Sequence, residues 1–277
     1  MLGRIIHVCS ALPPLRKVFY KQFYEYVTRN YKFEDWTCMN LGYAPLDGDL
    51  RLDLQAAEEP NRYGFQLYHH VASAVDLSGL DVLEVGCGRG GGTYYVMRQF
   101  KPASLIGLDF SSECVTLATN RYKHPGLSFA KGDAENLPYK DGTMDAVINI
   151  ESTHCYGNVE RFLSEVYRVL RPGGYFLFAD FRDLEQAKTL HHQLRHCGLT
   201  VLKNTDITAN VVRALDLDSD RKREFFARNG PAVKRLEPLA GIKGSRVFEA
   251  FSTGKMVHQR AVLQKPAPAH LTSEMQV

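Results

Sequence analysis

Short apolar runs alternate with segments of helical periodicity through the middle of the chain. Five of the runs are typical of buried strands, because they are short and bounded by turn residues: 82–85, 104–109, 127–130, 144–150 and 175–180. Three intervening segments are expected to be helices: 93–99, 112–122 and 159–170. Repeated strand–helix units predict a parallel sheet covered on both faces, because each crossover helix packs on one face.

The alternation continues for one more unit and is then interrupted. Residues 184–197 are expected to form a helix that ends at Gly198, and 199–203 a strand. A mostly helical block at about 206–254 precedes a last alternating strand at 256–263. The pattern therefore predicts a Rossmann-like, doubly wound α/β fold. Its seven-stranded, mostly parallel sheet carries helices on both faces and a helical insertion.

The two ends of the chain lie outside this repeating core. An aromatic-rich helix is expected at 16–33, within an N-terminal helical segment that we assign to residues 1–60. This segment and the helical insertion are expected to form a lid over the strand ends. The core is assigned to 61–265, including the insertion. Residues 266–277 contain prolines and small polar residues, and we expect a flexible tail there.

Composition and charge narrow the functional classes. Lys and Arg number 34 and Asp and Glu 31 among 277 residues, so the net charge is only +3 and does not favour nucleic acid as a partner. No apolar run approaches the ~18–20 residues of a transmembrane helix, and the N-terminus lacks the features of a signal peptide. The six cysteines show no CxxC spacing, which favours reduced thiols over zinc. We expect a cytoplasmic protein, with homodimerisation left open.

A glycine loop follows the first strand and opens the next helix. Gly86, Gly88 and Gly90 would let the backbone turn sharply and approach a ligand closely. In an open parallel sheet, ligands bind at the carboxyl ends of the strands, where this loop lies. A glycine loop alone is compatible with several nucleotides, or with a tight structural turn.

Three acidic residues make the ligand more specific, because each stands at the end of a successive strand. Glu84, two residues before the first glycine, can bind the ammonium of an amino-acid moiety and would repel a pyrophosphate. Asp109 can accept hydrogen bonds from both ribose hydroxyls, and Asp133 can accept one from an adenine amino group, with Ala134 nearby. Singly, each acid could equally be a helix cap or a surface residue.

Four segments together resemble the class I S-adenosylmethionine-dependent methyltransferases: 83–90 (LEVGCGRG), 107–109, 132–138 and 169–174. The resemblance covers roughly residues 60–265 and implies S-adenosylmethionine as the cofactor. We assign these residues to the cofactor site: Glu84, Gly86, Cys87, Gly88, Gly90, Asp109, Phe110, Asp133, Ala134, Glu135, Asn149 and Glu151.

Four further segments resemble the phthiotriol/phenolphthiotriol dimycocerosate methyltransferases, which O-methylate a hydroxyl on a polyketide-derived lipid: 59–62, 81–92, 125–127 and 151–156. The sugar O-methyltransferases of natural-product pathways are similar too. Their pattern places a histidine after the fourth strand and an aspartate at the end of the fifth, which are His154 and Asp180 here. In sterol and tocopherol C-methyltransferases the histidine falls one place later, at Cys155 of this chain, which disfavours C-methylation.

The resemblance and the chemistry of methyl transfer together suggest roles for two residues. A hydroxyl is a poor nucleophile unless a base takes its proton, and a histidine has a suitable intrinsic pKa. We therefore expect His154 to be the general base and Asp180 to orient its ring and stabilise the imidazolium. The alternative for His154 is a buried histidine whose polar atoms are satisfied by the backbone. We expect no metal, because no Asp-Asn pair follows Asp180.

The acceptor is less well defined than the cofactor. We expect a small hydrophobic acceptor, namely a lipid, polyketide or glycosylated natural product. Five aromatic residues are candidates to line its pocket or to close over the cofactor as a lid: Tyr20, Tyr24, Tyr31, Trp36 and Tyr43. Each could instead pack an amphipathic helix on the core.

Three other functions remain open at this point. One is C-methylation of a sterol or quinone-like acceptor, and another is a non-catalytic module that binds the cofactor. A nicotinamide oxidoreductase is disfavoured because Glu84 would oppose a pyrophosphate.

Overall fold

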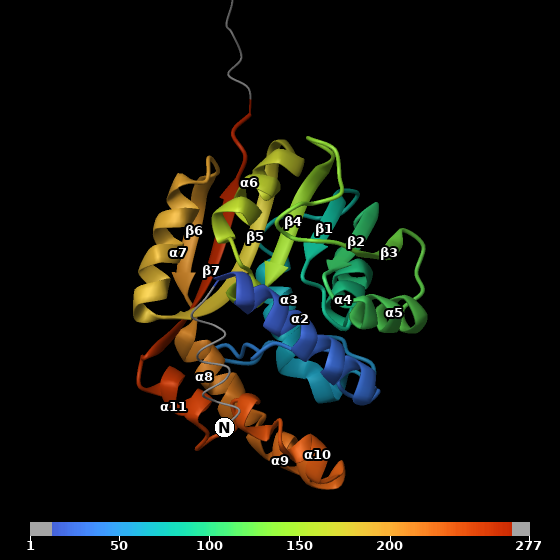
Figure 1. Ribbon diagram of the computed structural model, residues 1–277, viewed down its shortest axis with the longest axis vertical. Coiled ribbons are helices and arrows are strands. Elements are labelled where there is room, and N and C mark those ends of the chain that lie inside the picture. Colours follow the sequence, from blue (N-terminus) through green and yellow to red (C-terminus); the bar gives the residue numbers. More distant parts are fainter. Residues whose placement is uncertain (1–12, 268–277) are drawn as a thin grey trace, which may run out of the picture.

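The computed structural model describes residues 13–267, which form one seven-stranded sheet flanked by helices (Figure 1). The strand order is β3-β2-β1-β4-β5-β7-β6. The strands span Asp81–Val85 (β1), Ser104–Asp109 (β2), Leu127–Lys131 (β3), Met144–Ile150 (β4), Leu170–Asp183 (β5), Thr200–Asp206 (β6) and Met256–Gln264 (β7). Residues 1–12 of the N-terminal segment and 268–277 of the tail lie outside the described residues.

The sheet is parallel except for its last strand. β1 pairs in parallel with β2 and β4, while β7 runs antiparallel to both β5 and β6. The strand order reverses between β1 and β4, so the connections on the two sides diverge and leave a crevice at the carboxyl ends of these strands. The predicted seven-stranded, mostly parallel Rossmann-like sheet is confirmed.

Two hydrophobic clusters bury the two faces of the sheet. Val82 belongs to one cluster and Leu83 to the other, because successive residues of a strand point to opposite faces. The first cluster includes residues of α3 (Arg62–Ala72) and α4 (Gly91–Phe100), and the second those of α6 (Val159–Val169) and α7 (Leu184–His196). α5 (Ser112–Arg121) packs on β2 and β3, and its N-cap Ser111 accepts a hydrogen bond from Cys114 N.

Several helices lie outside the repeating core. α2 (Pro13–Asn30) contacts α5 and the short 3-10 helix η2 (Thr153–Cys155), and Figure 1 shows it at the edge of the sheet to which the arrowhead of β4 points. The insertion between β6 and β7 contains α8 (Thr208–Leu217), α9 (Ser219–Arg228), α10 (Gly230–Lys234), η3 (Glu237–Leu239) and α11 (Arg246–Ser252). A further 3-10 turn, η1 (Glu59–Asn61), leads into α3.

The fifth strand begins earlier than the sequence pattern predicts. We expected a helix to Leu170 and a strand from Tyr175, but the helix ends at Val169 and β5 starts at Leu170. Leu170 pairs with Met144, and the register then shifts before Tyr175 pairs with Ala146. The proline and glycines at 172–174 therefore form a bulge within a strand, and Gly173 adopts a φ of 80° there.

Candidate active site

The glycine loop closes one end of a cavity at the carboxyl ends of β1 and β2. Gly86 and Gly88 have φ values of 83° and 53°, a region that favours glycine. A Cβ on Gly86 would lie 2.4 Å from Ser152 Oγ, so this position also needs a side chain with no volume. Gly86 N and Cys87 N both donate to Leu108 O, at 2.7 and 3.1 Å, which ties the loop to β2. The cavity is lined by Gly86, Cys87 and Gly88.

Acidic residues at the ends of the next two strands line the same cavity. Asp109 accepts hydrogen bonds from Gly88 N and Ser111 N, both at 2.8 Å, and its burial raises the pKa of its carboxyl. Asp133 accepts one from Glu135 N at 3.0 Å. Four further residues assigned from the sequence line this cavity: Phe110, Ala134, Glu135 and Glu151. The structure thus brings together most of the residues assigned to the cofactor site.

Three residues assigned to the cofactor site lie outside the described lining of this cavity. Glu84 is buried behind the loop, where it accepts a hydrogen bond from Tyr68 Oη at 2.7 Å and has one oxygen without a partner. Burial raises the pKa of Glu84 to about 7, against the opposing effect of the nearby Thr93 and Tyr68 hydroxyls. Gly90 is the left-handed N-cap of α4, and Asn149 Nδ2 donates to Val85 O at 2.8 Å.

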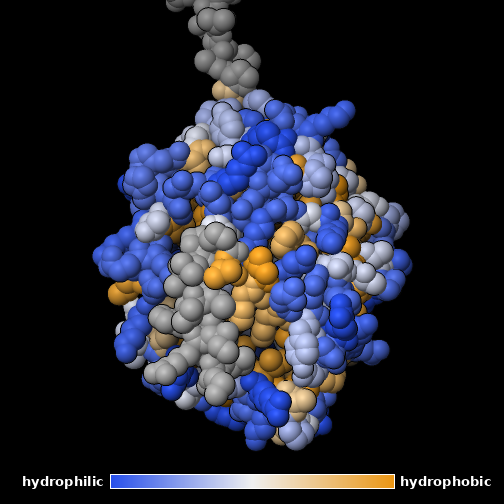
Figure 2. All heavy atoms as spheres, viewed as in Figure 1, coloured by the Kyte–Doolittle hydropathy of each residue, from blue (hydrophilic) through white to orange (hydrophobic). Residues whose placement is uncertain are grey.

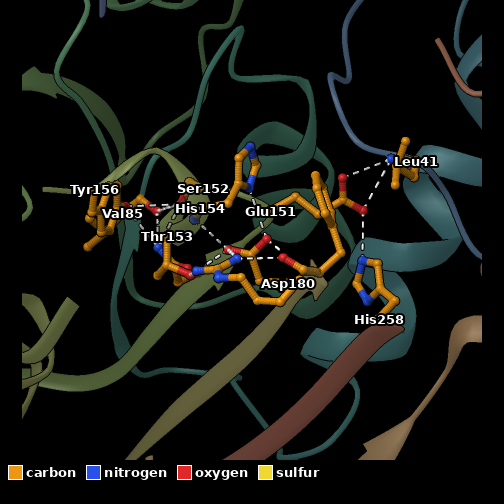
Figure 3. Close-up of polar contacts among 12 residues, drawn as sticks. Leu41, Val85, Glu151, Ser152, Thr153, His154, Tyr156, Asp180 and His258 are labelled. Atoms are coloured by element: carbon orange, nitrogen blue, oxygen red, sulfur yellow. Dashed lines mark hydrogen bonds and ion pairs between the residues drawn. The ribbon is translucent and has the colours of Figure 1, made fainter. Parts of the chain in front are cut away.

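His154 and Asp180 are in contact, as the sequence led us to expect. His154 Nδ1 lies 3.0 Å from Asp180 Oδ1, and His154 N donates to Asp180 Oδ2 at 3.0 Å (Figure 3). Thr153 Oγ1 also donates to Asp180. The His154 ring lies 4.5 Å from the Phe181 ring in a tilted contact and meets the Tyr20 ring edge-on at 5.8 Å. In the described structure the cavity lining includes Tyr20 and Cys155, with His154 beside them.

The surroundings of this pair favour its charged form. Burial alone would raise the pKa of Asp180, but Arg182 and His154 outweigh burial and hold it well below the usual range. Burial lowers the pKa of His154, whereas Cys155 and Asp180 outweigh burial and raise it to about 10. Arg182 Nη1 lies 3.2 Å from Asp180 Oδ2. Asp180 is therefore an anion that favours an imidazolium at His154.

A second buried acid–histidine pair stands beside the first. Glu151, at a φ of 47°, accepts hydrogen bonds from His258 Nε2 at 2.9 Å and from Leu41 N at 3.0 and 3.1 Å (Figure 3). Glu151 was expected from the sequence to bind the cofactor. Its hydrogen bonds connect the end of β4 with β7 and with the segment that follows α2, and its side chain borders the cavity.

A second, mainly apolar cavity adjoins the first. The two share the residues Tyr20, Tyr24, Cys38, Met39 and Asn40. The second cavity lies between α2 and the insertion helices, and its apolar lining includes Phe19, Phe23, Val27, Trp36, Phe225, Phe226, Leu236 and Leu239. The outer surface on the viewed face is mostly hydrophilic, with hydrophobic residues gathered near its middle (Figure 2). An apolar molecule in this cavity would lie next to the glycine-loop cavity.

The aromatic residues singled out from the sequence separate into two groups. Tyr20 and Tyr24 line both cavities, and Trp36 lines the apolar one. Burial raises the pKa of Tyr20 to about 12, so its phenol stays protonated. Among the described residues, Tyr31 and Tyr43 lie outside both linings: Tyr31 stacks on Phe33 and Tyr43 on His70.

Sequence reasoning missed several polar residues around the two cavities. Lys17 of α2 forms a 2.7 Å ion pair with Asp133 and lies 3.3 Å from Glu135. Lys222 of α9 lines the apolar cavity, and Arg182 and His258 hold the two buried acids. Among these, only Arg182 had a signal in the sequence, because it follows the expected strand-end Asp180 by two residues.

The residues that line the glycine-loop cavity fit S-adenosylmethionine. A Cβ on Gly86 would clash with Ser152 and one on Gly88 would lie 2.7 Å from Met39 Cε, so the loop can line the cavity in this shape only with glycine at both positions. The carboxylates of Asp109, Asp133 and Glu151 border the cavity and suit the ribose hydroxyls, the adenine amino group and the positive charge of the donor. Within residues 13–267, no cluster of three or more His, Cys, Asp or Glu residues is arranged to hold a metal ion.

Comparison with known proteins identifies the family. Residues 83–178 match the family described as "Methyltransferase domain". The chain is 38% identical over 245 residues to the phthiotriol/phenolphthiotriol dimycocerosates methyltransferase of Mycobacterium tuberculosis, covering 88% of this chain and 90% of that protein. It is 41% identical over 247 residues to the fatty-acid O-methyltransferase of Mycolicibacterium smegmatis, covering 89% and 90%.

A solved structure with a similar fold is that of the cyclase SpnF. Its TM-score is 0.68 at 24% identity, over 90% of this chain and 95% of that one, and this likeness concerns the fold. No helix within residues 13–267 is long and apolar enough to cross a membrane. The glycine loop, the acids after β2 and β3 and the likeness to relatives along nearly the whole chain lead to one conclusion: the chain belongs to the class I S-adenosylmethionine-dependent methyltransferases.

Proposed function

We propose that the enzyme methylates an oxygen atom of a lipid-like acceptor. The observation that carries the proposal is that the apolar cavity adjoins the cofactor cavity, because Tyr20 and Tyr24 line both of them. The printed names of two relatives, a phthiotriol methyltransferase and a fatty-acid O-methyltransferase, support a long-chain acceptor whose oxygen is methylated. Aromatic walls of this kind suit an alkyl chain.

For a hydroxyl acceptor, His154 is proposed to be the general base. S-adenosylmethionine, when bound, supplies a methyl group that its sulfonium charge already activates. The acceptor oxygen forms the new O–C bond as the S–C bond breaks, and the hydroxyl proton passes to the His154 ring. Asp180, 3.0 Å from His154 Nδ1, holds the ring and stabilises the imidazolium that results. The acceptor reaches His154 between Tyr20 and Cys155, which border the cavity.

The raised pKa of His154 determines the pH dependence of this reaction. A general base must be neutral, and a pKa of about 10 keeps the imidazole protonated at neutral pH in the enzyme without ligands. The rate with a hydroxyl acceptor should therefore rise with pH and level off above the pKa. The sulfonium charge of a bound donor should lower that pKa, so the levelling in the donor complex should come earlier.

The same raised pKa favours a second candidate, in which the acceptor is a carboxylate. A carboxylate needs no base, because it is already ionised, and an imidazolium at His154 would hold it by a charge-assisted hydrogen bond. Here the rate should fall as pH rises through the pKa of His154. The product would be a methyl ester rather than a methyl ether.

The two candidates are separated by pH–rate profiles measured with a long-chain alcohol and the matching acid. Transfer of labelled methyl groups should be followed between about pH 6 and pH 10, which spans the ordinary and the raised pKa of the histidine. With the alcohol, a rate that rises with pH in the wild type but not in His154→Ala supports the general base. With the acid, a rate that falls as pH rises supports an imidazolium at His154 that holds the carboxylate. Profiles that His154→Ala leaves unchanged in shape would contradict both roles.

A further inference from the structure

Lys222 is a buried cation in an otherwise mainly apolar cavity. It belongs to α9 and lines the cavity together with Phe225 and Phe226, and its side chain is only 14% exposed. Within residues 13–267 its ammonium has two polar partners: it donates to Ala240 O at 3.0 Å and lies 3.4 Å from Asp218 Oδ2. An ammonium carries three protons, so a further donor remains for a ligand.

The acid next to Lys222 is already neutralised by another residue. Arg221 donates to both oxygens of Asp218, through Nε at 2.5 Å and Nη2 at 2.8 Å. The other acid of this cavity, Asp35, pairs with Arg228. One carboxylate thus faces two cations at this end of the cavity, which leaves one positive charge in excess.

A third acid, Glu151, lies farther away and does not contact Lys222. Burial lowers the pKa of Lys222, while Asp218 and the more remote Glu151 oppose that shift. Both oxygens of Glu151 already accept hydrogen bonds from Leu41 N, and one of them from His258. A buried cation that is not fully paired is costly, and an anionic ligand would relieve that cost.

We infer that Lys222 forms an anion subsite in the acceptor cavity and binds a carboxylate carried by the acceptor. The inference rests on the proposed function in one respect, because it takes the apolar cavity to be the place of the acceptor. One excess charge and one spare donor suit a singly charged carboxylate on an alkyl chain. A phosphate carries more charge and more acceptor atoms than these groups can satisfy.

The chain contains one tryptophan, Trp36, and it lines this cavity, so its fluorescence reports binding there directly. The enzyme with S-adenosylhomocysteine present should be titrated with decanoate and, separately, with decanol. We expect decanoate to bind at least about tenfold more tightly, as for hydrogen bonds to charged groups. Lys222→Met should remove that preference, while Lys222→Arg should keep it. Lys234→Met, at an exposed position of α10, should behave as the wild type.

Equal affinity of the wild type for the acid and the alcohol would overturn the inference, as would a Lys222→Met variant that keeps the preference. If Lys222→Met does not fold, Lys222→Gln, which keeps a polar side chain without the charge, takes its place, and His154→Ala, which should keep the preference, excludes the histidine as its source. The proposed function can fail independently of this inference. Tight, Lys222-dependent binding of decanoate without methyl transfer to any alcohol or acid would contradict the proposed function but support the anion subsite.

Discussion

The cofactor cavity and the acceptor cavity differ in how they are built. The first is formed mainly at the ends of adjacent strands, where backbone bonds such as that from Gly86 N to Leu108 O tie the loop to β2, and α2 contributes Tyr20 and Tyr24. The second is formed by α2, the segment that follows it and the insertion helices, and side chains such as Asp35 of that segment and Arg228 of α9, 193 residues apart in the chain, hold these parts together. The cofactor site is thus a property of the sheet, whereas the acceptor site depends on segments added to it.

The largest effect is expected at His154, which lies beside the cofactor cavity and contacts Tyr20. His154→Ala should lower turnover of a hydroxyl acceptor by about 10²–10⁴, the usual contribution of a general base. Binding of S-adenosylhomocysteine, measured by calorimetry, should stay unchanged because His154 lies beside the cofactor cavity rather than in its described lining. His191→Ala on α7 is the matched control and should retain full activity. Weakened cofactor binding in His154→Ala would show that the two cavities are not independent there.

A substitution in the glycine loop tests the cofactor cavity separately. Gly86→Ala places a Cβ 2.4 Å from Ser152 Oγ at a φ of 83°, so the loop must shift. Strain of about 1–3 kcal/mol corresponds to a loss of cofactor affinity of roughly tenfold or more. Gly142→Ala has a comparable φ of 60° with no atom within 4 Å, and it should leave affinity unchanged. Equal losses in both variants would mean that general backbone strain, rather than the close approach at Gly86, controls binding.

A substitution at Phe225 should change the acceptor cavity without changing the cofactor cavity. This side chain is buried in the cavity wall, where its ring meets Trp36 at 6.0 Å and Phe33 at 5.3 Å. Phe225→Ala should raise the KM for a long-chain acceptor by about tenfold, because several apolar contacts are lost. Calorimetry should find the same affinity for S-adenosylhomocysteine as in the wild type. A KM that does not change would place the acceptor outside this cavity.

The smallest effect is expected where α2 reaches across to the cofactor cavity. Lys17 pairs with Asp133, and both side chains are partly exposed, at 22% and 33%. Such a pair contributes up to about 1 kcal/mol, so Lys17→Met should tighten cofactor binding by less than about fivefold as it frees Asp133. Lys188→Met is the matched control, because Lys188 pairs with Glu185 at an exposed position of α7, away from the cofactor cavity. Weaker binding in Lys17→Met would indicate that this lysine holds the cofactor cavity closed.

The cofactor half was largely predictable from the sequence, because its residues follow local rules. Alternating apolar runs indicated the strands, and strand-end position was enough to place Asp109 and Asp133 on one cavity. Glu84 shows the limit of such rules. The sequence places it beside the loop, but packing against Tyr68 directs its side chain behind the loop.

The acceptor half could not be predicted to the same degree, since its contacts arise only when distant segments pack. Lys222 and His258 had no motif, and they acquire their surroundings from Ala240 and Glu151. Tyr31 and Tyr43 belong to the same aromatic series as Tyr20 and Tyr24, yet they pack elsewhere. Periodicity identifies a helix with aromatic residues but does not show which of them face a cavity.

The most direct test of methylation at an acceptor oxygen is the identity of the product. The enzyme should be incubated with S-adenosylmethionine carrying an isotopically labelled methyl carbon and with long-chain alcohols and acids, and the product examined by NMR spectroscopy. We predict a labelled methyl group bonded to oxygen, as an ether or an ester, on a long-chain acceptor. A labelled methyl group bonded to carbon, or no transfer to any long-chain acceptor while S-adenosylhomocysteine still binds, would contradict it.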